Sequence, residues 1–160
     1  MKNISLLYLL LICVGFASCK NDKNQKNPQV TPVNEEKPIS VECYKAIYES
    51  DTINLKINTL KNGEITGHMV MKILDKPQKV GEIAGKFHGD TLFVDYTFIQ
   101  GTYDKVTYKN PMAMLKKEGG LILGSGKIES YLGRSYFAKG TPIDFERVKY
   151  KFTKVQCQDK

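Results

Sequence analysis

The chain has no tryptophan and only two histidines among its 160 residues. Histidine is the usual general base near neutral pH and a common metal ligand, so this inventory is poor for catalysis. His68 lies on the polar side of an alternating segment, and His88 lies in a turn sequence. No cysteine or carboxylate stands at metal-ligand spacing from either histidine. We therefore expect solvated histidines, no metal and no cofactor.

Catalytic motifs are also missing. Ser125 stands in Gly124-Ser125-Gly126, which is not the Gly-x-Ser-x-Gly pattern of a nucleophile elbow. A bent strand accounts for these glycines. No pair of carboxylates is marked out for hydrolysis. The sequence therefore predicts a protein that is not an enzyme, and a hydrolase is the least favoured alternative.

Long hydrophobic runs are scarce, and the one that stands out covers residues 4–16. Lys2 precedes it, and the small residues Ala17 and Ser18 follow. This layout is typical of a secretory signal and is too short for a membrane-spanning helix. We expect residues 1–18 to be a signal peptide that is removed on export.

Cys19 directly follows the small residues, and this stretch resembles the lipobox of bacterial lipoproteins. The resemblance implies that the Cys19 thiol carries diacylglycerol and that the new amino group is acylated. Several acyl chains make such an anchor effectively permanent. The expected location is the outer membrane, on its periplasmic face or at the cell surface. An ordinary signal peptide with an incidental Cys19 is the alternative.

The net charge of +7 is strongly basic. A basic chain often binds nucleic acid, but an exported protein rarely meets any. Anionic lipid headgroups, lipopolysaccharide phosphates or acidic glycans are therefore the expected counter-charges.

Cysteines are few, and each has an expected use. Cys13 lies within the signal and Cys19 carries the lipid, which leaves Cys43 and Cys157 at the two ends of the folded region. In an oxidising compartment these two should form a disulfide, which would place the first and last strands side by side. Two free thiols are the alternative.

The domain organisation follows from composition. Residues 19–40 hold the lipidated cysteine and a polar linker with Pro28, Pro32 and Pro38. Such a coil spans about 25 Å on average. Residues 41–160 are long enough for one core and should form a single domain.

No long amphipathic helical pattern follows Cys19; the period is two instead. Ile53, Leu55 and Ile57, for example, should point inward from one strand. Tight turns such as Asn62-Gly63 separate the strands. The expected strands are 43–48, 52–59, 65–73, 81–87, 92–98, 103–109, 111–115, 121–129 and 145–155.

Short strands joined by tight turns predict an all-β fold, an antiparallel meander of about eight strands closing into a small barrel of calycin-like or lysozyme-inhibitor-like type. Glycines within strands fit the bends that closure needs, namely Gly67, Gly81, Gly85, Gly124 and Gly126.

Several short motifs are similar to those of small lipoproteins of flavobacteria and related Bacteroidota. They are Cys43-Tyr44, Asp51-Thr52-Ile53, the run Gly81, Gly85, Gly89, Asp90, Thr91, Leu92, then Tyr96-Thr97-Phe98, and Cys157. The resemblance covers nearly the whole expected domain. It implies a β-barrel and an envelope address, and no particular activity.

Two sets of residues are candidates for binding. Met69, Met71, Tyr96 and Phe98 are expected inside the barrel, either around a ligand cavity or as core filling. Phe93 and Ile99 are expected on the outer face of their strand, where they form either an interaction surface or an apolar area covered by another segment.

Two polar features have similar alternatives. Arg147, Lys149 and Lys151 form either a cationic stripe for lipopolysaccharide or glycan, or a solubilising strand face. Thr52 and Thr91 follow aspartates and match the Asp-Ser/Thr-aliphatic pattern of O-glycosylation in Bacteroidota. Local backbone hydrogen bonding at turns explains the same residues.

The sequence thus favours a non-enzymatic envelope lipoprotein that binds a small ligand or an envelope component. The alternative is a protein-interaction module, either lysozyme-inhibitor-like or an accessory of envelope assembly.

Overall fold

The computed structural model describes residues 36–158, and everything below concerns these residues. The expected signal peptide, the expected lipidation site at Cys19 and linker residues 19–35 lie outside them. No helix among the described residues is long and apolar enough to cross a membrane.

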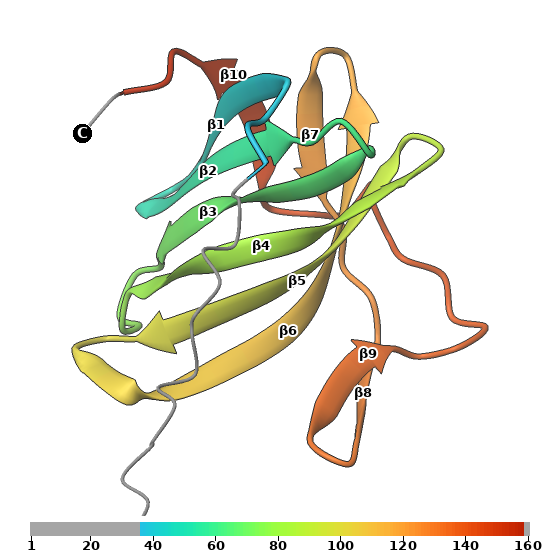
Figure 1. The fold of residues 1–160 in the computed structure, drawn as a ribbon. Helices are drawn as coiled ribbons and strands as arrows, with labels where there is room; N and C mark the ends of the chain where they lie inside the picture. Colours follow the sequence, from blue (N-terminus) through green and yellow to red (C-terminus); the bar gives the residue numbers. More distant parts are fainter. Residues whose placement is uncertain (1–35, 159–160) are drawn as a thin grey trace, which may run out of the picture. The chain divides into compact units, whose positions relative to one another are not determined.

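The described chain is all-β. Eight strands form a closed antiparallel barrel in the order β1-β10-β7-β6-β5-β4-β3-β2, and β8 and β9 form a separate hairpin (Figure 1). This confirms the predicted eight-stranded meander. The strands are β1 Ser40–Tyr48, β2 Asp51–Thr59, β3 Glu64–Lys72, β4 Lys79–His88, β5 Thr91–Gln100, β6 Tyr103–Lys117, β7 Gly120–Leu123, β8 Ile128–Tyr131, β9 Arg134–Phe137 and β10 Lys151–Val155.

Alternation along the strands builds the core. In β2, Ile53, Leu55 and Ile57 are buried, while Asn54 and Lys56 between them are exposed. The same period in the other strands directs one side of each into the barrel. The core consists of Tyr44, Ala46, Ile53, Leu55, Ile57, Ile65, Met69, Ile83, Leu92, Val94, Tyr96, Phe98, Met114, Leu121 and Phe152.

Glycines allow neighbouring strands to coil tightly. A Cβ at Gly81 would collide with the carbonyl oxygen of Thr97 on β5, and one at Gly85 would collide with that of Phe93. Both positions face inward where the backbone of β5 lies very close to that of its partner β4. Any side chain there would force the two backbones apart. Gly67 on β3 has the same close approach, to the carbonyl oxygen of Lys56 on β2. The prediction that in-strand glycines allow tight coiling therefore fits Gly67, Gly81 and Gly85, whereas Gly124 and Gly126 lie between β7 and β8 and are not in strands.

A disulfide joins Cys43 to Cys157, as predicted. The two cysteines are 114 residues apart in sequence and their Cα atoms are 5.2 Å apart. β1 pairs with β10 over Cys43↔Val155 to Ala46↔Phe152, so the first and last strands are indeed neighbours.

Three strand boundaries differ from the prediction. Residues 103–109 and 111–115 belong to one strand, β6. The expected strand 121–129 is divided between β7 and β8. The expected strand 145–155 is ordered as a strand only from Lys151 onward, in β10.

Candidate functional site

The candidate site is a pocket at one end of the barrel. This end carries the β3–β4 and β5–β6 turns and the connection from β7 to the hairpin. Further in, the barrel is filled, since Met69, Ile83 and Leu92 are fully buried. The pocket has a volume of about 250 Å³. We call it the mouth pocket.

An aromatic stack forms one wall of the mouth pocket. The rings of Tyr96 and Phe98 lie 4.7 Å apart between centroids, and those of Phe98 and Tyr108 lie 5.5 Å apart. Tyr96 and Phe98 are two residues apart on β5, and Tyr108 is the cross-strand partner of Phe98 on β6. Buried Tyr96 donates a hydrogen bond from its hydroxyl to the carbonyl of Met69 (3.1 Å). Burial raises the pKa of Tyr96.

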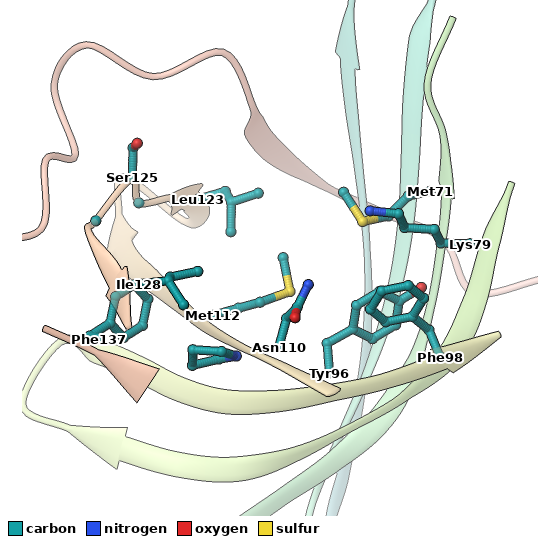
Figure 2. Close-up of a pocket in the computed structure, with 13 residues that line it drawn as sticks. Met71, Lys79, Tyr96, Phe98, Asn110, Met112, Leu123, Ser125, Ile128 and Phe137 are labelled. Carbon is teal, nitrogen blue, oxygen red and sulfur yellow. The ribbon is translucent and has the colours of Figure 1, made fainter. Parts of the chain in front are cut away.

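The remaining wall is mostly apolar. Figure 2 shows Met71 and Lys79 beside the aromatic rings, Leu123, Ile128 and Phe137 on the opposite side, and Met112 and Asn110 between them. Met side chains adapt to irregular shapes, so a pocket with two of them tolerates some variation in its occupant.

Lys79 is the cation of the mouth pocket. Its Nζ lies 5.0 Å from the centroid of the Phe98 ring, a cation–π geometry. Among the described residues, no carboxylate is within ion-pair distance of Lys79. The amide of Asn110 is the neighbouring polar group. The pocket therefore combines a mostly apolar lining with the half-buried residue Lys79, which has no ion-pair partner among the described residues.

Two glycines let the segment between β7 and β8 pack closely against later residues of the chain. A Cβ at Gly126 would lie 2.8 Å from the Phe137 ring, and one at Gly124 would lie 2.5 Å from both Ile143 and Phe145. Between the glycines, Ser125 pairs with Asp144 through an isolated bridge. Residues 124–126 thus pack against the later segment, and Ser125 lies between β7 and β8 rather than in the bent strand that the sequence predicted.

A second polar and aromatic cluster lies at the same end, on the end of β1, the start of β2 and the segment just before β10. The hydroxyl of Tyr150 donates to Asp51 (2.6 Å), which also accepts the backbone N–H of Leu74 (2.8 Å). Both hydrogen bonds lower the pKa of Asp51, and the one from Tyr150 has the larger effect. Burial and the bond to Asp51 raise the pKa of Tyr150 to about 12. The Nζ of Lys149 lies 5.2 Å from the centroid of the Tyr48 ring.

The four residues expected around a cavity have different positions. Met71, Tyr96 and Phe98 line the mouth pocket. Met69 is 0% exposed, lies in the core and does not line the pocket.

The expected outer surface is divided. Phe93 is 38% exposed and packs edge to face with His88, with ring centroids 5.8 Å apart. Ile99 is half-buried and lies opposite Val80. The two apolar residues therefore do not form one equally open patch.

The three expected cationic residues also lie in different settings. Arg147 pairs with Asp144 (2.9 Å), and Lys149 lies over Tyr48, both before β10 begins. Lys151 is exposed on β10 and lines a separate outer hollow of about 470 Å³ with Lys117 and Lys154. Of the three, only Lys151 is on a strand.

The two candidate glycosylation threonines lie at strand beginnings. Thr52 is opposite Lys72 and Thr91 is opposite Leu115, and both are half-buried. That these hydroxyl groups carry O-linked glycans stays a prediction.

Sequence reasoning missed several residues that line the mouth pocket, both polar and apolar. Asn110 and Met112 continue the inward alternation of Tyr108, so the period of two contained a signal for them. Lys79 follows the turn Asp75-Lys76-Pro77 and was not distinguishable from other strand lysines. Ile128 and Phe137 reach the pocket only through the hairpin, which the sequence did not reveal.

Comparisons with protein-family models, with curated proteins and with solved structures find no match to this chain.

Proposed function

We propose that this protein is an outer-membrane lipoprotein whose barrel holds one small amphiphilic anion in the mouth pocket without altering it chemically. The ligand would have an apolar body, such as a single acyl chain, and a carboxylate or similar anionic group. The observation that carries the proposal is Lys79, which lies in a mostly apolar hollow with no carboxylate of the described residues within ion-pair distance.

The chemistry of the lining supports this ligand class. Apolar pockets with a few well-placed polar groups are the usual form of small-molecule sites. Met71, Met112 and Leu123 offer apolar contacts to an alkyl chain. The Lys79 ammonium and the Asn110 amide offer hydrogen-bond donors to an anionic group.

Size limits the ligand further. Small-molecule pockets typically span about 300–1,000 Å³, and the mouth pocket, at about 250 Å³, lies just below that range. A single tail or a compact ring fits this volume better than a multi-chain lipid. The filled core beneath prevents deeper entry.

Native mass spectrometry of the full-length protein, extracted gently from its own membrane, tests the proposal. We expect a non-covalent extra mass that leaves on activation. Titration with a medium-chain fatty acid such as decanoate then tests the ligand class. Lys79→Gln should weaken binding about ten- to a hundredfold, because a hydrogen bond to a charged group contributes about 1.5–3 kcal/mol.

Lys86→Gln is the matched control, since Lys86 is an exposed lysine on the same strand and does not line the pocket. Its affinity for decanoate should equal that of the unaltered protein. Equal affinities of Lys79→Gln and Lys86→Gln, or no decanoate binding at all, would remove the support for this ligand and favour the protein-interaction alternative.

A further inference from the structure

The most exposed apolar residues of the hairpin lie at its turn. β8 and β9 pair with each other and with no barrel strand, and the hairpin projects beside the barrel with its turn pointing away (Figure 1). Tyr131 is 67% exposed and Leu132 is 85% exposed. We call residues Tyr131, Leu132, Gly133 and Arg134 the hairpin tip.

The backbone at the hairpin tip does not explain a leucine. Leu132 and Gly133 both have positive φ, 48° and 76°. This is the φ pattern of a type I′ turn, which favours Asn, Asp or Gly and disfavours bulky apolar residues. Leu132 therefore occupies a strained position without being buried. Strain of this kind points to a role for the side chain outside the fold.

The other turns of the chain provide a comparison. Three further non-glycine residues in the described part of the chain have positive φ, and all are acidic, namely Glu49, Asp75 and Glu118. Glu118 and Gly119 have φ of 52° and 78°, nearly the same conformation as Leu132 and Gly133. Among these four positions the fold accepts charged residues three times, so the leucine is not demanded by the turn.

The hairpin tip carries one charged residue, Arg134, and it is basic. Arg134 lies directly opposite Tyr131 in the hairpin register. Lys127 and Lys139 lie at the base of the hairpin, away from the tip, and Lys127 pairs there with Glu129 at 3.2 Å. No carboxylate in the described part of the chain is within ion-pair distance of Arg134.

We propose that the hairpin tip docks into the surface of an anionic lipid bilayer. Leu132 would enter the boundary of the acyl chains, Tyr131 would lie at headgroup level, and Arg134 would contact lipid phosphates. A narrow tip with two apolar side chains suits a bilayer better than a protein partner, since a stable protein interface buries about 1,200–2,000 Å² in total. This part of the inference rests on the proposed function: in a protein anchored by its N-terminal segment, the contact would orient the barrel on the membrane.

The absence of tryptophan allows a direct test. Full-length protein carrying Leu132→Trp is reconstituted into vesicles of phosphatidylcholine and phosphatidylglycerol that contain brominated lipid. We expect blue-shifted tryptophan emission and strong quenching by the bromines. Glu118→Trp is the matched control, because position 118 has nearly the same φ as position 132 and the rest of the protein is unchanged. The tryptophan at position 118 should be quenched several-fold less. Equal quenching at the two sites, or no quenching at position 132, would overturn the proposal and leave a protein partner as the occupant.

A second pair of variants separates docking from turn stability. Tyr131→Trp serves as the reporter, alone and together with Leu132→Asn. Asparagine suits positive φ, so the melting temperature of the double variant should stay equal or rise. Quenching should nevertheless fall markedly, because the apolar side chain is gone. Unchanged quenching in the Leu132→Asn background would refute a docking role for Leu132.

Discussion

At Asp51, one side chain connects three segments of the barrel's open end. It accepts hydrogen bonds from Tyr150 and from the backbone of Leu74, and its pKa is lowered as a result. A carboxyl group whose folded-state pKa is depressed stabilises the fold above its unfolded pKa of about 4, and this contribution disappears as pH falls through the folded-state pKa.

Asp51→Asn should therefore lower the melting temperature at neutral pH and should flatten its decline in acid. Melting curves recorded at a series of acid and neutral pH values would check both effects. Tyr150→Phe is the companion variant, because it removes the first cause of the pKa shift and leaves the carboxylate in place. Parallel acid profiles for Asp51→Asn and the unaltered protein would show that this carboxylate does not contribute.

Sequence alone predicted which apolar residues face inward better than it predicted the pocket. Ile53, Leu55 and Ile57 are inward because alternation within one strand decides their side. Lys79 reaches the pocket because it lies over Phe98 of another strand. That placement depends on the register between β4 and β5, and the sequence of one strand alone does not reveal this register. Met69 and Met71 share one face, yet only Met71 is near enough to the barrel end to line the pocket.

At the scale of elements, the β8–β9 hairpin differs most from the rest of the chain. All four β8 residues are exposed, and each of its strands has only four residues. Isolated two-stranded hairpins are marginally stable in water. Backbone amides of Glu129 to Tyr136 should therefore exchange with deuterium much faster than those of β3 to β5, where every strand has partners on both sides.

Hydrogen exchange followed by mass spectrometry would check this difference. Addition of anionic vesicles should slow exchange in the hairpin and leave β3 to β5 unchanged, if the tip docks as proposed. If, in the free protein, the hairpin amides are as well protected from exchange as those of β3 to β5, the hairpin is not marginally stable.

The misjudged strand boundaries have local physical causes. Pro111 suggested a break, but β7 pairs with β6 only from Met114 to Lys117, so at Pro111 one edge of β6 has no strand partner and a missing N–H is tolerated. Gly124 and Gly126 interrupt the segment 121–129, because their small size lets Ile143 and Phe137 pack against the backbone. Contacts of this kind involve residues from a later part of the chain, so the alternation within one short segment does not predict them.

At the scale of the whole molecule, closure depends on a short seam. β10 pairs with β7 at only two positions, Lys151↔Ile122 and Phe152↔Leu121, whereas β4 and β5 pair along their full length. On its other side β10 pairs with β1, and the Cys43–Cys157 bridge lies beside this pairing. The covalent link therefore holds the last strand against the first where the ladder on the other side is brief. This explains why two distant cysteines were an informative sequence signal for closure.

Replacement of both cysteines, Cys43→Ser with Cys157→Ser, should lower the free energy of unfolding by about 4–5 kcal/mol, because a loop of this length no longer restricts the unfolded chain. Urea unfolding measures the loss, and a steeper denaturant dependence is expected since the unlinked chain exposes more surface. Far-ultraviolet circular dichroism should still report strands, because the bridge adds no core contact. Thiol titration should first verify the disulfide in the unaltered protein. If the double variant is then as stable as the unaltered protein, the unfolded chain already keeps its ends close and the seam alone closes the barrel.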